Sequence, residues 1–402
     1  MQKELHRDTL LIHAGYDPNL YDGSLTPPLF QTSTFTFQTA EQGERRFSGE
    51  EDGYIYSRLG NPTVRALEER MALLEKGEAA LAFGSGMAAV SAVLFHLVKA
   101  GDHILCSRGV YGCTFGLLEL LEEKFGVTHT FSPMRTALEV EEGITAKTTC
   151  IYLETPINPT MELIDIEMVT SIAKKYGIPV VVDNTFASPY LQNPLKLGAD
   201  YVIHSATKYI GGHGDVIAGI VVGKRKDEME KIRFSTQKDI GGIISPFDAW
   251  LLLRGLKTLH VRMERHVENA KKIAAFLKDH PYVERVIYPG DEESGQFNIM
   301  AKQMKAPGGL ISFTLRGGKN EAQQFMNNLK LIKTAVSLGD AETLIQHPAT
   351  MTHAVVPPES RKAMGISDNM LRLSVGLESS DDLIEDLRLA FQKMEFPLTQ
   401  KP

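Results

Sequence analysis

Residues 180–185 read VVVDNT and residues 201–208 read YVIHSATK, and these two stretches decide the fold. Each begins with an apolar run that is too short for a helix and ends in polar residues. Similar runs occur before and after them, and several are separated by amphipathic stretches with helical spacing, such as 166–176. Short runs that are apolar on both faces, alternating with helices, are typical of a mainly parallel sheet covered by helices. The expected strands are 79–83, 103–106, 150–153, 180–182, 201–203 and 217–222.

The regions on either side of this α/β core have different patterns. Residues 1–60 show no sustained period and predict an extended arm, which ends where Asn61 and Pro62 favour the start of a helix that runs to Gly77. A long helical region, 246–277, leads to expected strands at 310–315 and 370–375 and a final helix at 380–394. We therefore predict three parts: an N-terminal arm (1–60), a large α/β domain (61–256) and a C-terminal α+β domain (257–402).

Composition excludes several classes of protein. The chain has 402 residues with 43 Lys and Arg against 50 Asp and Glu, a formal net charge of −7, and no basic cluster that would gather nucleic acid. Its start lacks the apolar core of a signal peptide, and no apolar run reaches the ~18 residues of a membrane span. Three cysteines are too few for a disulfide framework and lack the spacing of a zinc site. These features predict a cytoplasmic protein without a metal, nucleic-acid or membrane partner.

Lys208 and Asp183 are the first candidates for chemistry. Lys208 follows an expected strand, stands beside the hydroxyls of Ser205 and Thr207, and precedes a Gly-rich turn. A lysine in this position suits a Schiff base with phosphate-binding neighbours, although a solvated surface lysine is the alternative. Asp183 ends the preceding strand, at the sheet edge where ligands bind, and could keep a pyridine nitrogen protonated. Its alternative role is a turn or helix-cap aspartate.

A loop of small residues joins the first expected strand to a helix. Its pattern, Gly84-x-Gly86-x-x-Ala89, lets backbone N–H groups approach a phosphate. The same pattern fits the dinucleotide fingerprint of an oxidoreductase, which requires an acidic residue at the end of the next strand. The chain has Ser107 and Arg108 there, so only an NADP-dependent oxidoreductase remains open as a second class.

Five motifs in chain order resemble one enzyme family. They are YSRLGNPT (56–63), GSGMA (84–88), VDNT (182–185), SATKY (205–209) and GHGD (212–215). Together they resemble the cysteine/methionine-metabolism family of fold type I pyridoxal-phosphate enzymes, and the resemblance extends from about residue 13 to 378. It implies an α/β transferase-like fold with a mainly parallel sheet in the large domain, and pyridoxal 5′-phosphate as the cofactor.

The resemblance also implies roles for individual residues. Lys208 would form the Schiff base and act as catalytic base, Asp183 would pair with the ring nitrogen, and Tyr111 would stack on the ring and protonate the departing thiolate. The phosphate would be surrounded by Ser85, Gly86, Met87, Ser205 and Thr207. Tyr56 and Arg58 would reach the phosphate of a neighbouring subunit, so we expect a dimer with shared active sites, within a homotetramer.

The substrate side is expected to bind an amino acid. Arg372 lies in an alternating apolar strand pattern, where a substrate carboxylate would satisfy its guanidinium; an intramolecular ion pair is the alternative. By resemblance Ser337 lies beside that carboxylate and Asn158 beside the ring oxygen of the cofactor. His204 ends a buried strand, and a hydrogen-bonded packing role is favoured for it.

Two features resemble the methionine γ-lyase branch of the family. Cys113 follows Tyr111 by two residues, and Lys238 and Asp239 form a pair that we expect to hold Cys113 or Tyr111 through hydrogen bonds. An inert cysteine and a solvated pair are the alternatives. The branch implies α,γ-elimination of methionine to methanethiol, 2-oxobutanoate and ammonia, with homocysteine also plausible. Cystathionine γ-lyase, homocysteine desulfhydrase and cystathionine γ-synthase remain open.

Overall fold

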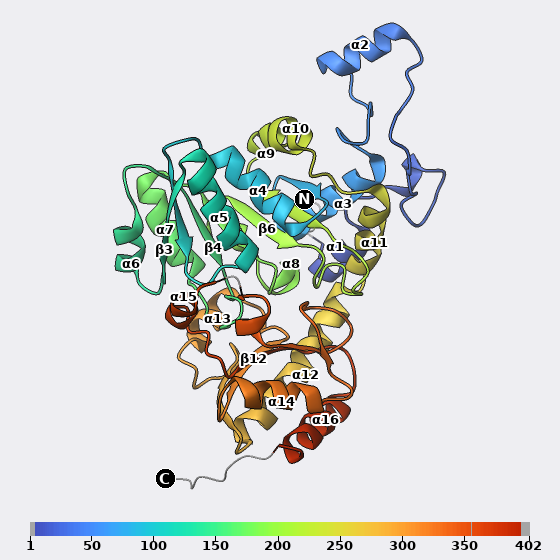
Figure 1. Cartoon of the computed structure of the whole chain (residues 1–402). Coiled ribbons are helices and arrows are strands. Elements are labelled where there is room, and N and C mark those ends of the chain that lie inside the picture. The colour runs from blue at the N-terminus through green and yellow to red at the C-terminus, as the bar shows by residue number, and fades with distance from the viewer. Residues whose placement is uncertain (1–4, 355, 395–402) are drawn as a thin grey trace.

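A seven-stranded mixed sheet forms the centre of the molecule (Figure 1). The computed structural model describes residues 5–354 and 356–394. Five strands are parallel, and β7 pairs antiparallel with both β1 and β6. The strand order is β1 (Ala79–Phe83), β7 (Gly219–Gly223), β6 (Tyr201–Ser205), β5 (Val180–Asp183), β4 (Thr148–Glu154), β2 (His103–Ser107) and β3 (Thr128–Ser132). The mainly parallel α/β sheet that the sequence predicts is confirmed.

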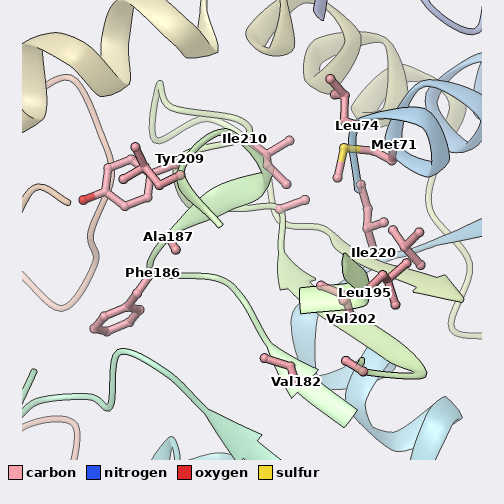
Figure 2. Packing of buried hydrophobic residues seen from close by; sticks show 14 of the residues in the cluster. Met71, Leu74, Val182, Phe186, Ala187, Leu195, Val202, Tyr209, Ile210 and Ile220 are labelled. Carbon is pink, nitrogen blue, oxygen red and sulfur yellow. The ribbon is translucent and has the colours of Figure 1, made fainter. Parts of the chain in front are cut away.

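Helices bury both faces of this sheet. One face packs against α3 (Pro62–Glu75), α6 (Ala137–Gly143), α7 (Ile166–Tyr176), α8 (Ser188–Leu191) and α11 (Pro246–Leu256). The other packs against α4 (Gly86–Leu97), α5 (Gly112–Phe125) and α9 (Lys226–Ile232). Within β5, Val180 and Val182 join the first cluster and Val181 the second, which explains the unbroken apolar run. Figure 2 shows Met71 and Leu74 of α3 near Ile220 in the first cluster.

A second sheet forms the C-terminal part of the molecule. Its order is β10 (Lys333–Thr334), β11 (Leu344–Gln346), β12 (Met370–Ser374), β9 (Leu310–Leu315) and β8 (Val283–Ile287), and all pairs except β10–β11 are antiparallel. This sheet packs against α12 (Leu259–Asp279), α14 (Lys319–Asn328) and α16 (Ser380–Gln392). The first half of α12 contributes to the core of the large sheet and its second half to this one. The boundary at 256/257 stays a prediction.

The helical region predicted over 246–277 consists of two helices. It is divided into α11, which ends at Leu256, and α12, which begins at Leu259. A Cβ on Gly255 would lie 2.6 Å from the carbonyl oxygens of both Ile210 and Gly211, so α11 packs tightly against the segment that follows Lys208. Arg262 then donates to the Gly255 carbonyl at 2.8 Å, which satisfies a backbone group left open by the helix end.

The N-terminal arm is not wholly extended. It contains α1 (Arg7–His13), a 3₁₀ turn η1 (Pro18–Leu20) and α2 (Ala40–Ser48), which stands away from the body in Figure 1. The edge strand β3 was also absent from the predicted set, because its residues alternate in exposure instead of forming an apolar run. The remaining elements are η2 (Pro194–Leu197), η3 (Arg233–Gln237), α10 (Lys238–Ile240), α13 (Phe297–Gln303), η4 (Pro348–Thr350) and α15 (Pro358–Ala363). Within 5–354 and 356–394, no helix is long and apolar enough to cross a membrane.

Candidate active site

Polar side chains meet at the carboxyl ends of three neighbouring strands. Because β4, β5 and β6 are parallel and adjacent, their last residues, Glu154, Asp183 and Ser205, lie along the same edge of the sheet. Lys208 follows in the turn after β6, where its backbone N–H donates to the Ser205 carbonyl at 3.2 Å. The parallel topology therefore gathers residues that are up to 54 positions apart, from 154 to 208, in one place.

The amine of Lys208 lies between the two domains. Its Nζ donates to the Ser337 hydroxyl at 3.2 Å, and the side chain is largely buried. Burial lowers the pKa of Lys208, and the positive charge of Arg372 lowers it further, against the opposing effect of Asp340. A lysine whose neutral form is favoured in this way can act as a nucleophile and as a base.

Asp183 is held as a buried carboxyl at the end of β5. It accepts hydrogen bonds from the backbone N–H of Thr185 at 3.0 Å and from the Tyr152 hydroxyl at 3.3 Å. Burial raises the pKa of Asp183, and these hydrogen bonds oppose the change. A cationic N–H donor placed beside this carboxyl would favour its ionised form.

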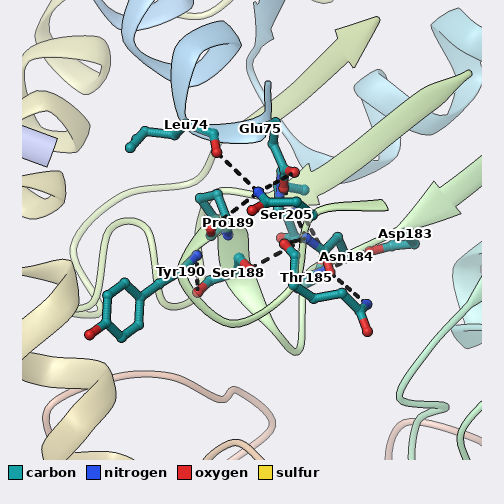
Figure 3. A network of polar contacts seen from close by, with 12 residues as sticks. Leu74, Glu75, Asp183, Asn184, Thr185, Ser188, Pro189, Tyr190 and Ser205 are labelled. Carbon is teal, nitrogen blue, oxygen red and sulfur yellow. Dashed lines mark hydrogen bonds and ion pairs between the residues drawn. The ribbon is translucent and has the colours of Figure 1, made fainter. Parts of the chain in front are cut away.

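A separate polar network lies behind Asp183 and supports the loop that follows β5 (Figure 3). Glu75, at the end of α3, is fully buried and accepts from Asn184 at 2.8 Å, from Asn193 at 3.1 Å and from His204 Nε2 at 2.7 Å. His204 is therefore a buried, hydrogen-bonded residue of this network, the packing role favoured for it above.

The loop after β1 forms a cradle against the ends of β6 and β7. Ser85 caps α4, its hydroxyl accepting from the Ala88 N–H at 3.0 Å. A Cβ on Gly86 would lie 2.9 Å from the Ser205 Cβ, and a Cβ on Gly219 would lie 2.1 Å from the Ser85 carbonyl oxygen. Glycine at both positions is therefore required for this close approach, which places Ser205 at the amino end of a 12-residue helix.

Arg372 forms the opposite wall from β12 of the C-terminal domain. It is 3% exposed and donates to Asn158 Oδ1 and to the Ser337 carbonyl, each at 2.8 Å, while its Nε has no hydrogen-bond partner. No carboxylate in the described residues lies within ion-pair distance of it, so the alternative of an intramolecular ion pair is wrong. A buried guanidinium with an open donor is suited to binding an anionic group such as a substrate carboxylate.

Tyr111 and Cys113 lie at the amino end of α5. The Tyr111 N–H donates to Glu154 Oε2 at 3.0 Å, while a hydrogen bond with the Cys113 thiol, together with partial burial, raises the pKa of Tyr111 to about 12. Both side chains remain partly exposed, at 39% for Tyr111. The hydroxyl is thus kept protonated at neutral pH and can donate a proton.

Comparison with known proteins identifies the family. Residues 8–392 match the family model described as Cys/Met metabolism PLP-dependent enzyme. The chain belongs to this family. It is 51% identical over 388 residues to an L-methionine gamma-lyase of Fusobacterium nucleatum subsp. polymorphum, covering 96% of this chain and 98% of that protein. It is 43% identical to a cystathionine gamma-lyase of Bacillus subtilis, covering 97% and 100% of the two chains.

A solved structure shows the same fold. The crystal structure of cystathionine gamma-lyase from Lactobacillus plantarum complexed with L-serine superimposes with a TM-score of 0.91 at 44% identity, covering 96% of this chain and 99% of that chain. The predicted family, the fold type I architecture and pyridoxal 5′-phosphate as cofactor are therefore confirmed.

The residues present fit the cofactor of the family. The Gly86 cradle beside Ser205, at the positive end of α4, is suited to a phosphate group. Asp183 is placed to receive a protonated ring nitrogen, and Lys208 to hold the aldehyde carbon. Of the other predicted phosphate residues, Met87 accepts from the Thr114 hydroxyl at 3.9 Å, and Thr207 Oγ1 accepts from the Ala218 N–H at 3.0 Å.

Four predicted site residues form a different cluster. Arg58 donates to the Lys238 carbonyl at 2.8 Å, and its guanidinium lies 5.7 Å from the centre of the Tyr56 ring. Lys238 Nζ forms an ion pair with Asp239 at 2.9 Å. Within the part of the chain described, the pair forms no hydrogen bond with Tyr111 or Cys113, which differs from the expectation. These four side chains thus belong to the arm and α10, not to the sheet edge.

Sequence analysis missed Glu154 as a functional residue. Its carboxyl is 4% exposed and receives the N–H of Tyr111 at 3.0 Å on one oxygen and that of Asn158 at 3.3 Å on the other. Burial raises the pKa of Glu154 well above its ordinary value, while these hydrogen bonds act in the opposite direction. Glu154 directly follows the expected strand 150–153, just as Asp183 follows 180–182, so the rule that singled out Asp183 points to Glu154 as well.

The oxidoreductase alternative is excluded by strand order. A dinucleotide fingerprint requires the second strand to lie beside the first, so that the residue at its end reaches the ribose. Here β1 is at one edge of the sheet, and four strands (β7, β6, β5 and β4) separate it from β2. Arg108, at the end of β2, therefore cannot serve a nucleotide bound at Gly84–Ala89.

Proposed function

We propose that this enzyme catalyses the α,γ-elimination of L-methionine, with water consumed, to methanethiol, 2-oxobutanoate and ammonia. The observation that carries the proposal is the 51% identity, over nearly the full length of both chains, to a protein named L-methionine gamma-lyase. The buried Arg372 with an open donor and the Tyr111–Cys113 pair support it, since one suits an amino-acid carboxylate and the other a short sulfur-containing side chain. Homocysteine fits the same description.

Arg372 binds and orients the substrate in this proposal. Its open Nε–H donates a hydrogen bond to the substrate carboxylate, while Asn158 Oδ1 and the Ser337 carbonyl hold the guanidinium in place from both domains. Fixing the carboxylate fixes the direction of the Cα–H bond relative to Lys208, whose Nζ already contacts Ser337 at 3.2 Å.

Lys208 is the proton carrier. Pyridoxal 5′-phosphate, when bound, supplies an electron sink for the charge that develops at Cα and then at Cβ. The lowered pKa of Lys208 favours the neutral form of its Nζ, which can take the Cα proton and afterwards a Cβ proton. A protonated ring nitrogen beside Asp183 would favour the ionised form of this carboxyl, and that charge would maintain the sink.

Tyr111 completes the elimination at the γ-carbon. Its hydroxyl, with a pKa raised to about 12 by the Cys113 thiol and by burial, is protonated and can transfer that proton to the departing methanethiolate. The Cys113 thiol positions the hydroxyl and lines the space for the methylthio group.

We also propose a homo-oligomer with shared active sites, a dimer within a tetramer. Arg58 and Tyr56 lie on the arm with exposed side chains, and Arg58 contacts the backbone of Lys238 instead of the cradle of its own chain. Large apolar side chains on the arm, η3 and α10 are exposed, at 81% for Leu25, 70% for Phe47 and 61% for Phe234. A second copy would cover them. The predicted cytoplasmic location stays a prediction.

The test is a pair of steady-state assays for 2-oxobutanoate with methionine and with cystathionine. Wild-type enzyme is expected to prefer methionine, and Cys113→Gly to lower kcat/KM for methionine by more than about tenfold, or ~1.4 kcal/mol, with a much smaller loss on cystathionine. Cys113→Ser, which keeps a hydrogen bond to Tyr111, is the matched control and should retain most of the activity. Equal losses on both substrates would make Cys113 a packing residue.

A preference of the wild type for cystathionine would instead assign the chain to cystathionine γ-lyase. The 43% identity to the Bacillus subtilis cystathionine gamma-lyase and the structural likeness to the Lactobacillus plantarum enzyme support this second candidate.

A further inference from the structure

A cavity of about 400 Å³ lies between the large domain and the C-terminal domain, outside the active site. Four cationic side chains line it. Arg108 follows β2 and Arg135 follows β3 in the large domain, whereas Arg285 lies in β8 and Lys362 in α15 of the C-terminal domain. Glu162 is the single acidic residue among its lining residues.

Most of this positive charge has no protein partner. Arg135 pairs with Glu162, but the side chains of Arg108, Arg285 and Lys362 form no hydrogen bond or ion pair with any described residue. Three unpaired cations around one cavity stand out on a chain whose net charge is −7. Like charges gathered from two domains repel one another unless an anion lies between them.

We propose that this cavity binds a small organic dianion, a dicarboxylate or a phosphate monoester, and that the ligand bridges the two domains. Guanidinium groups on opposite walls match two oxyanion groups, because each can bind an oxyanion with paired N–H donors. Thr160 and Gln296 in the lining supply further polar groups.

The cavity shares a wall with the active site. A Cβ on Gly109 would lie 2.7 Å from Ile157 Cγ2, so the segment after Arg108 packs directly against Ile157. Tyr111 lies two residues after Gly109, and Asn158 follows Ile157. The backbone N–H groups of Tyr111 and Asn158 both donate to the Glu154 carboxyl. A dianion held by both domains would stabilise the packing in which Arg372 of the C-terminal domain donates to Asn158 of the large domain at 2.8 Å. We therefore expect it to strengthen substrate binding.

The binding test is isothermal titration calorimetry on the holoenzyme with succinate and, separately, with inorganic phosphate, at ionic strength matched with chloride. Wild type is expected to bind at least one probe, and the double variant Arg108→Gln/Arg285→Gln to bind it at least about tenfold more weakly. Arg388→Gln removes an exposed arginine of α16 that pairs with Glu385, and this control should bind as wild type does. Saturation by one probe alone identifies the anion class. No binding of either probe, or equal binding by all variants, would overturn the proposal.

The coupling test rests on the proposed function. With the probe that binds, KM for methionine should fall at least about twofold in wild type and stay constant in the double variant. An unchanged KM with confirmed binding would overturn the bridging role. Absence of methionine turnover, with binding intact, would refute the proposed substrate and leave the anion site standing.

Discussion

The Glu154→Gln substitution tests how the backbone of the active site is held. The native carboxyl uses one oxygen for the Tyr111 N–H and the other for the Asn158 N–H, at 3.0 and 3.3 Å. Glutamine keeps one oxygen and presents an NH₂ group to the second donor, which becomes a buried, unsatisfied N–H. Such a group costs about 1–3 kcal/mol, and we expect the free energy of unfolding to fall by that amount.

The same change should impair catalysis, because both donors belong to site residues. Tyr111 carries the proton donor and Asn158 holds Arg372 at 2.8 Å, so a shift of either backbone misplaces a reacting group. We expect kcat/KM for methionine to fall about 10- to 100-fold, or ~1.4–2.7 kcal/mol, with KM raised through Arg372 and kcat lowered through Tyr111.

Urea unfolding and steady-state assays on the holoenzyme measure the two effects. Glu78→Gln is the matched control, since Glu78 also accepts one backbone N–H, from Lys226 at 3.0 Å, but at an exposed site. Glu78→Gln should change neither the free energy of unfolding nor kcat/KM appreciably. Lower stability of Glu154→Gln with unchanged kinetics would reduce Glu154 to a structural residue, and unchanged stability would refute the hydrogen-bond reasoning itself.

Three other experiments test the site and the stability of the fold. Lys208→Ala should abolish turnover and the covalent attachment of the cofactor while circular dichroism shows an intact fold; a loss of only a few-fold would contradict the assigned role. Mixing Arg58→Ala chains with Arg372→Ala chains should restore activity above that of either parent variant if sites are shared. A hybrid dimer then contains one site with neither substitution. Exchange of chains without recovery of activity would show that Arg58 serves its own subunit. Burial lowers the pKa of His266 to about 4, whereas its ordinary value in the unfolded chain is 6.5. Between these two values the unfolded chain binds a proton that the folded chain does not. The free energy of unfolding should therefore fall as the pH falls from 6.5 toward 4, by up to about 1.4 kcal/mol per pH unit. Urea unfolding between pH 7.5 and 5 should show a smaller decrease in the free energy of unfolding for His266→Asn than for wild type. Parallel plots of this free energy against pH for the two proteins would contradict the role of His266.

The parts of the fold that the sequence predicted are those in which burial decides the pattern. Val180–Val182 is apolar throughout because α-helices cover both faces of β5, and a run of that kind is visible without any structure. The edge strand β3 alternates in exposure, and α1 and α2 have 7 and 9 residues, too few to show a helical period. The break between α11 and α12 depends on the contact of Gly255 with Gly211, which the local sequence does not contain.

In the candidate site, the strand-end rule found Asp183 and Lys208 because parallel strands bring their carboxyl ends to one edge. The same rule points to Glu154, which follows the expected strand 150–153, although it was not among the predicted site residues. Ser337 and Arg372 lie in the C-terminal domain, and their contacts with Lys208 and Asn158 arise only when the two domains pack. Ser337 was therefore reached only through family resemblance, and Arg372 through its apolar strand pattern taken together with that resemblance.

Three buried arginines show why a sequence pattern alone could not single out the substrate-binding one. Burial lowers the pKa of Arg70, Arg262 and Arg372 to about 10 in each case. Arg70 donates through Nε to the Ala14 carbonyl at 2.8 Å, and Arg262 through Nε to the Thr258 hydroxyl at 3.2 Å. Arg372 alone among these three leaves Nε without a partner. A buried cation whose donors are all satisfied stabilises its own chain, whereas one with an open donor, such as Arg372, is suited to a ligand that brings a carboxylate.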